Sequence, residues 1–449
     1  MRLKKLTLSN FRGFEQIEID FCDDFTVIAG VNGSGKSSLL RAISGIGSYL
    51  LPEITPAKKE AFSLAESDIY SGKLALSIST TFKTEKQILY GQILRSRSAK
   101  GNTSDLTEEL TKLRVEKRFT EKGSKEEVLI NDKMYNINQS LKESKDNFSW
   151  HSENDEVANP LIICYSTNRS LSRLSKQTSK VRPLTPANAY SNALQEIEVS
   201  LNEFANWYRA CENGLLGDEA TSLRLLKTLE AVIDTMMPSF SELLLVDKPT
   251  PHFTIKKNNT QFELDQLSEG ERGILALAFD LTRRLTLANP QSQNPIEEGF
   301  ALVMIDEIEL HLHPQWQRNV LKRLTSIFKN CQFIVTTHSP QVIGQVPAEN
   351  LRLLYIDKEE GKIRSITPRR SLGMDSSWIL ENIMDAPARD PDTALRLENI
   401  FNLIDQHDYL LAKQQIDALS KDRGGIFPDL QQAITLLNQL ELLEGNEED

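Results

Sequence analysis

The sequence predicts an α/β fold in which a mixed sheet carries helices on its flanks. Three observations predict it. An apolar strand, a glycine-rich loop and a helix follow one another over residues 25–43. Two apolar runs, 301–305 and 332–337, each lead into polar residues, as strands do when they deliver ligand-binding side chains at the carboxyl edge of a sheet. A third run, 161–165, has the composition of a fully buried central strand.

The composition limits the class of protein. The chain has 449 residues, a net charge of -11 and four cysteines that form no CxxC pair. This length suggests two or three domains, and such cysteines are typical of core residues in a reduced compartment. No apolar run approaches the length of a membrane span and no basic-then-apolar leader is present, so we expect a cytoplasmic protein without a membrane partner. The acidic balance is unlike that of a nucleic-acid binder, although a local basic groove stays open.

Residues 30–37, Gly-Val-Asn-Gly-Ser-Gly-Lys-Ser, match the phosphate-binding pattern G-x-x-x-x-G-K-[ST]. Glycines let the backbone wrap round a phosphate chain, and the loop amides and helix N-terminus point at the anion. Lys36 would reach the β- and γ-phosphates, and the Ser37 hydroxyl would hold Mg²⁺. An ordinary glycine-rich turn is the alternative, but the flanking strand and helix argue against it. The predicted nucleotide-binding residues are Asn32, Gly33, Ser34, Gly35, Lys36, Ser37 and Ser38.

The first half of the chain divides by composition. Residues 1–94 are expected to form the first half of the nucleotide-binding head, beginning with two strands joined by a turn at 10–14. Residues 95–158 are strongly polar and are expected to be an insertion with a solvated face rather than a DNA contact. Residues 159–190 supply a strand and a loop rich in Ser, Arg and Pro, and apolar spacings of three and four predict a helical hairpin over 191–240.

Residues 241–368 should complete the head, and their first motif is Leu-Ser-Glu-Gly-Glu at 267–271. On local rules this is a capping box, with Ser268 as N-cap and Glu271 three residues later. A serine hydroxyl at a helix N-terminus is also an anion site. One nucleotide cannot use two such sites on one side, but two chains meeting head to head could each lend this segment, with Ser268, Gly270 and Glu271, to the other's γ-phosphate.

Two acids and a histidine follow the apolar runs of this half. Asp306 would orient Mg²⁺ through water, and Glu307 would polarise the attacking water as general base. Two solvated acids at a strand end are the alternative. His338 follows the run 332–337 and is best interpreted as a γ-phosphate sensor at the same edge of the sheet. Residues 369–449 contain a Pro-rich linker at 385–392 and about three amphipathic helices, which either pack on the head or dock a partner.

The ordered motifs resemble those of the ABC-type ATPases of the SMC, RecF and OLD group. This resemblance implies a P-loop NTPase fold, ATP and Mg²⁺ as cofactors, an Arg12 that swings over the nucleotide, and a head-to-head dimer. The signature differs from the commonest version, with Glu269 in place of glycine and Glu271 in place of glutamine. No glutamine matches the family's Q-loop, for which Asp68 is the best candidate. The matching segments are 10–14 (arginine turn), 30–37 (Walker A), 267–271 (signature), 306–307 (Walker B), 309–313 (D-loop) and 336–340 (switch histidine).

More closely, the chain resembles the ATPase subunit (PtuA) of Septu-type anti-phage systems and its retron-associated relatives. The resemblance rests on the helical insert at 191–237, the 336–340 ending and the segment 386–419. It implies an HNH endonuclease partner (PtuB-like) that the ATP state of this chain controls. OLD nucleases carry a C-terminal Toprim domain instead, but here no Asp-x-Asp lies on an apolar strand. Two alternatives stay open: a RecF-like DNA-repair ATPase that binds DNA directly, and an ATP-gated scaffold with little hydrolysis.

Overall fold

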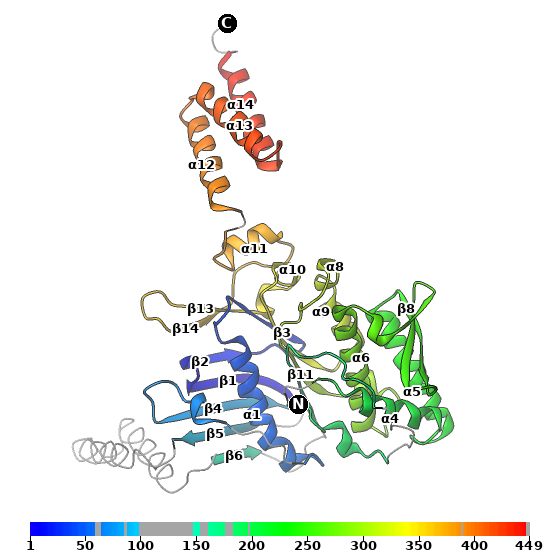
Figure 1. Cartoon of the computed structure of the whole chain (residues 1–449). Coiled ribbons are helices and arrows are strands. Elements are labelled where there is room, and N and C mark those ends of the chain that lie inside the picture. Colours follow the sequence, from blue (N-terminus) through cyan, green and yellow to red (C-terminus); the bar gives the residue numbers. More distant parts are fainter. Residues whose placement is uncertain are drawn as a thin grey trace, which may run out of the picture. The chain divides into compact units, whose positions relative to one another are not determined.

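The structure is a computed structural model that describes residues 1–58, 64–84, 88–97, 147–152, 160–175, 183–195, 198–387 and 389–445. The chain divides into two compact units, Met1–Met374 and Asp375–Asp449 (Figure 1). The sequence placed this boundary at 368/369 instead. Most of the predicted polar insertion, 95–158, lies outside the described residues.

A six-stranded sheet forms the centre of the first unit, in the order β14-β13-β3-β12-β11-β7. Every neighbouring pair is parallel except β13 and β14, which form an antiparallel hairpin. The sheet is therefore mixed, as predicted, and the carboxyl ends of β3, β11 and β12 meet at one edge. The strands are β3 (Phe25–Gly30), β7 (Leu161–Tyr165), β11 (Ala301–Ile305), β12 (Gln332–Thr337), β13 (Leu351–Ile356) and β14 (Ile363–Ile366).

Strand β7 lies at the edge of this sheet, so the prediction that it is a central strand is wrong. Its apolar run has another cause. The amide of Cys164 donates to the carbonyl of Ala193 at 2.7 Å, so the segment around Ala193 covers the open edge. Helix α1 packs on the strand as well. An edge strand covered in this way needs the same apolar composition as a central one.

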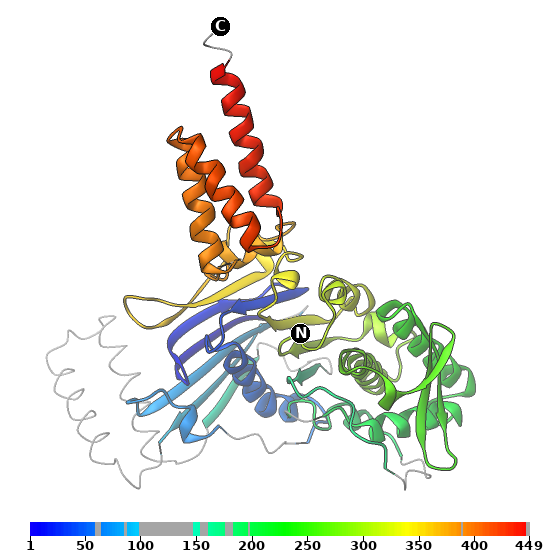
Figure 2. The same ribbon diagram turned by 45° about the horizontal axis from the view of Figure 1, so that its top comes forward.

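A second, antiparallel sheet of five strands has the order β2-β1-β4-β5-β6. Helix α1 (Lys36–Ile54) contacts β3 and β7 of the first sheet and β4 and β5 of the second, so it lies between the two sheets (Figure 2). Strand β6 falls inside the predicted insertion and pairs with β5, so a part of that range belongs to the sheet. The strands are β1 (Arg2–Phe11), β2 (Phe14–Asp20), β4 (Ala75–Lys83), β5 (Ile88–Ser96) and β6 (Asn147–Ser152).

The helical hairpin packs on helix α6 (Glu269–Ala288) of the head. The ring of Phe204 stacks on that of Phe279, with centroids 4.2 Å apart. The hairpin begins at residue 201, where Ser200 caps the helix, and not at 191 as its spacing suggested. Its helices are α4 (Leu201–Glu212) and α5 (Glu219–Met236), and a small antiparallel sheet follows with β8 (Phe240–Val246), β9 (His252–Lys257) and β10 (Thr260–Glu263).

Two short helices, with a break between them, follow the D-loop segment. Helices α8 (Pro314–Gln317) and α9 (Val320–Ile327) are separated at Asn319, whose side-chain amide donates to the carbonyl of Gln315 at 3.0 Å. Such a local bond competes with the helical ladder. The remaining short elements of the unit are α7 (Pro295–Glu298), α10 (Pro340–Ile343), and the 3₁₀ turns η1 (Glu66–Asp68), η2 (Pro186–Ala189), η3 (Leu264–Gln266) and η4 (Ala348–Asn350).

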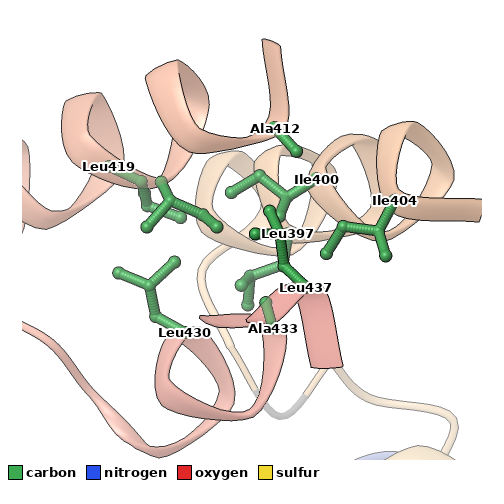
Figure 3. Close-up of a cluster of buried hydrophobic side chains, with 9 residues drawn as sticks. Leu397, Ile400, Ile404, Ala412, Leu419, Leu430, Ala433 and Leu437 are labelled. Carbon is green, nitrogen blue, oxygen red and sulfur yellow. The ribbon is translucent and has the colours of Figure 1, made fainter. Parts of the chain in front are cut away.

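The second unit contains the three helices that the sequence predicted and a further one, α11. Asp390, at the end of the predicted linker, caps α12 by accepting from the amides of Asp392 and Thr393. Leucine, isoleucine and alanine side chains of α12, α13 and α14 form a common core (Figure 3). The helices are α11 (Ser376–Asn382), α12 (Pro391–Asp405), α13 (Tyr409–Asp422) and α14 (Pro428–Gly445). Among the described helices of both units, none is long and apolar enough to cross a membrane.

Candidate active site

The phosphate-binding loop connects β3 to α1, as its pattern predicted. Gly30, Gly33 and Gly35 have φ angles of 156°, 81° and 93°, a backbone region that favours glycine. A Cβ on Gly35 would lie 2.4 Å from Cζ of Phe14. The turn at 10–14 therefore packs directly under the loop, which explains why the loop needs glycine there. Asn32 and Gly33 are exposed at the tip of the loop.

Lys36 folds back over the loop that precedes it. Its ammonium donates to the carbonyls of Gly30 at 2.8 Å and Val31 at 3.0 Å. Burial lowers the pKa of Lys36, and the carboxylates of Glu307 and Asp306 oppose that shift. The lysine is thus held against the loop carbonyls, near two acids from a distant part of the chain.

Asp306 follows β11 and connects it to two neighbouring elements. Its Oδ2 accepts from the Ser37 hydroxyl at 2.7 Å, and its Oδ1 accepts from the Thr336 hydroxyl at 2.5 Å. Strands β3, β11 and β12 are adjacent and parallel, so their carboxyl ends bring Ser37, Asp306 and Thr336 together. A serine hydroxyl and a carboxylate at this position are hard oxygen ligands of the kind Mg²⁺ takes.

Glu307 and His338 meet at the same edge, with Glu309 between them. Nδ1 of His338 lies 3.2 Å from Oε1 of Glu309 and 3.9 Å from Oε1 of Glu307. Glu309 is buried and also accepts from the Thr337 hydroxyl at 2.8 Å and from the His338 amide at 2.6 Å. Glu309 therefore orients the histidine. From the sequence, Glu309 was assigned only to the D-loop segment. Its position two residues after Glu307 could have indicated that it lies at the same edge of the sheet.

Arg12 lies beside the first turn of α1. Its Nε donates to Oδ1 of Asp68 at 2.7 Å, and its Nη1 donates to the Ser38 hydroxyl at 3.4 Å. Burial raises the pKa of the Asp68 carboxyl, but hydrogen bonds from Arg12 and the Ala65 amide, with the charge of Arg41, bring it below its ordinary value. The two candidates Arg12 and Asp68 thus form one ion pair beside the first turn of α1, in which the Asp68 carboxylate is buried and the Arg12 side chain is 36% exposed.

The signature segment forms the predicted capping box at the start of α6. The Glu271 amide donates to the Ser268 hydroxyl at 3.4 Å, and the Ser268 amide donates to Oε2 of Glu271 at 3.0 Å. Burial raises the pKa of Glu271, but the ammonium of Lys257, 2.6 Å from Oε1, and the Ser268 amide bring it below its ordinary value. A Cβ on Gly270 would lie 2.3 Å from the carbonyl oxygen of His311. The segment therefore packs against residue 311 of its own chain.

Arg169 is a site residue that the sequence did not reveal. It lies in the Ser- and Arg-rich loop after β7, a stretch in which no spacing distinguishes one arginine from another. In the structure it is 6% exposed, and its guanidinium donates to the backbone carbonyls of Asp306 and Glu307 at 2.6 and 2.7 Å. The loop after β7 is thus part of the site.

The AAA ATPase domain model matches residues 1–343 of the chain. The chain belongs to this family. A retron Ec83 probable ATPase of Escherichia coli is 31% identical to this AAA ATPase, over 87% of the chain and 78% of the relative. A retron Vc95 probable ATPase of Vibrio cholerae serotype O1 biovar El Tor is 26% identical, over 93% and 85%. A Septu protein PtuA of Bacillus thuringiensis is 22% identical, over 54% and 61%.

These relatives confirm the family resemblance inferred from the motifs, and the observed mixed sheet with flanking helices confirms the fold class. The AAA ATPase therefore binds a nucleotide and hydrolyses ATP. The roles of its individual site residues stay predictions.

Proposed function

We propose that this AAA ATPase is the regulatory subunit of a bacterial anti-phage complex, in which its ATP state controls an HNH endonuclease partner. One observation carries the catalytic part: the phosphate loop, Asp306, Glu307 and His338 converge at the carboxyl edge of three adjacent parallel strands. The defence role is supported by relatives named for retron and Septu systems that align with most or half of the chain.

Mg²⁺ fits the donors at this edge. The Ser37 hydroxyl and the Asp306 carboxylate are 2.7 Å apart, so both can face one ion. Mg²⁺ is usually bound by one or two protein oxygens, with phosphates and water completing its shell. We assign Ser37 and Asp306 as the protein ligands of this ion. When bound, the ion neutralises charge that develops on the β- and γ-phosphate oxygens.

The protein groups divide the remaining work. Lys36 can exchange its two carbonyl acceptors for phosphate oxygens without leaving the loop, because those carbonyls belong to the loop itself. The Glu307 carboxylate takes a proton from the attacking water, and the His338 imidazole donates to the γ-phosphate. Glu309 keeps that imidazole in place through the 3.2 Å contact with Nδ1.

A second copy of the chain completes the site in this proposal. Ser268 caps α6, and Gly270 lies in the first turn of that helix against residue 311. Among the hydrogen bonds and ion pairs between described residues, none joins segment 267–271 to the phosphate loop. A helix N-terminus is suited to binding an anion. Two heads that meet face to face would each present Ser268 to the other's γ-phosphate.

The experiment compares ATP turnover and oligomeric state for Glu307→Gln and the wild type. Glutamine keeps the size of the side chain but cannot accept the proton, so turnover should fall by at least about 100-fold. ATP should still bind, and an ATP-bound dimer should accumulate in light scattering. Glu359→Gln, in the exposed turn between β13 and β14, is the matched control. Normal turnover by Glu307→Gln would remove Glu307 as the base and with it the proposed mechanism.

A further inference from the structure

The guanidinium of Arg169 binds three consecutive backbone carbonyls. Nη1 donates to Asp306 O at 2.6 Å, and Nη2 donates to Glu307 O at 2.7 Å and to Ile308 O at 3.2 Å. A guanidinium is a rigid planar fork with five donors, so it can hold several fixed acceptors at once. These three carbonyls form the turn that carries the magnesium ligand and the proposed base.

The turn needs such support because Glu307 has an unfavourable backbone conformation. Its φ is 46°, in the left-handed region, which residues with a Cβ rarely adopt unless the surroundings hold them there. Three hydrogen bonds hold it. The Glu307 amide donates to the Thr336 hydroxyl at 2.8 Å, and the Glu307 carbonyl accepts from Arg169 at 2.7 Å and from the Leu310 amide at 2.9 Å. Thr336 therefore fixes the amide side of the residue, and Arg169 fixes the carbonyl side together with Leu310.

The segment after β7 holds the turn at a further point. The amide of Asp306 donates to the carbonyl of Tyr165 at 2.8 Å, and Arg169 follows four residues later. Arg169 is nine-tenths buried, which lowers the pKa of its guanidinium, while the carboxylates of Glu309, Asp306 and Glu307 act in the opposite sense. A buried charge is costly unless it is hydrogen-bonded and compensated. The three carbonyls and the nearby acids meet both requirements.

We propose that Arg169 is a positioning residue for ATP hydrolysis, which fixes the backbone of residues 306–308 so that the Glu307 carboxylate faces the nucleotide. This inference rests on the proposed role of Glu307 as general base. Arg169 touches no reacting atom. Its loss should therefore slow the chemical step and leave ATP binding, which depends on the phosphate loop, almost unchanged.

The test measures kcat, and the Kd of a non-hydrolysable ATP analogue, for Arg169→Lys and Arg169→Gln. Lysine keeps the positive charge but lacks the planar fork of the guanidinium. Glutamine has no charge to bury, so it can still be measured if the lysine variant does not fold. We expect kcat to fall at least about tenfold and Kd to change less than about twofold, because small displacements of a catalytic group cost this much. Lysine should retain more activity than glutamine.

Arg209→Lys is the matched control. Arg209 is as buried as Arg169, but it lies on α4 and pairs with Asp247, which follows β8. Its kcat shows how much activity is lost when the replacement of a buried arginine affects only the stability of the protein. The inference is overturned if both Arg169 variants keep kcat within about twofold of the wild type, if Kd weakens in proportion to the loss of kcat, or if Arg209→Lys loses as much kcat at the same melting temperature.

A double variant separates this inference from the proposed function. If Glu307→Gln lowers turnover as expected, adding Arg169→Lys should not lower the residual turnover further, because the positioned carboxylate is already gone. If Glu307→Gln turns over normally, the proposed base is wrong. If Glu307→Gln is inactive while both Arg169 variants are fully active, only the role of Arg169 is wrong.

Discussion

Replacing Asp280 by asparagine should destabilise the first unit by about 3–5 kcal/mol, the usual cost of removing one partner from a buried ion pair. Asp280 lies on α6 and is 3% exposed. Its Oδ1 accepts from Arg283 at 2.8 Å, and its Oδ2 accepts from Arg284 at 2.6 Å and from the Tyr165 hydroxyl at 2.9 Å. Asparagine keeps one acceptor oxygen but turns an amide donor toward these donors. Arg283 keeps its contact with Glu203 at 2.9 Å, whereas the buried charge of Arg284 loses the carboxylate that faces it.

The same carboxylate should make the stability of the first unit depend on pH in the acid range. Burial raises the pKa of Asp280, but Arg284 and Arg283 more than offset this and bring it from 3.8 to about 2. A depressed pKa means that the stabilisation is present above about pH 4 and is lost as pH falls toward 2. The difference from 3.8 corresponds to roughly 2–3 kcal/mol. The asparagine variant should lack this part of the acid dependence.

Urea unfolding at pH 7 and at pH 3, followed by circular dichroism, measures both effects. Tyr165→Phe is the control, because it removes one hydrogen bond to the carboxylate and should cost only about 1.5 kcal/mol. A loss below about 1 kcal/mol for Asp280→Asn at pH 7 would refute the reasoning. So would an asparagine variant whose stability falls with acid as steeply as that of the wild type.

Two further outcomes are expected. Gly270→Ala should destabilise the head by about 1–3 kcal/mol, because the new Cβ would lie 2.3 Å from the His311 carbonyl oxygen. The matched Gly273→Ala, with open space around its Cβ in the same helix, should instead stabilise the head by up to about 1 kcal/mol in the same thermal scan. Deletion of residues 375–449 should spare ATP turnover, since every predicted site residue lies in the first unit, and should prevent co-purification of the nuclease partner; a partner that still co-purifies would show that it docks elsewhere.

The residues whose location could be predicted from the sequence are contiguous or follow a strand. The phosphate loop carries its own pattern, and Asp306, Glu307 and His338 could be placed because parallel strands deliver their carboxyl ends to one edge. The capping box at Ser268 is likewise a local rule, and the structure shows it. The loop and the capping box follow from short-range spacing, whereas the residues at the strand ends follow from the parallel order of the strands.

The features that escaped prediction depend on contacts distant in sequence. Arg169 reaches a turn 137 to 139 residues away, and nothing in its own loop indicates this. Strand β7 has the composition of a central strand because a loop and α1 cover its edge.

The most direct test of the composite site mixes two inactive variants. Lys36→Ala lacks a working phosphate loop, and Ser268→Arg blocks the signature that a chain offers to its partner. Each alone should be inactive. A mixed dimer contains one intact site, so an equal mixture should recover about a quarter of the wild-type turnover under random pairing. Turnover that stays at the sum of the two separate variants would contradict the shared site and place all the catalytic groups within one chain.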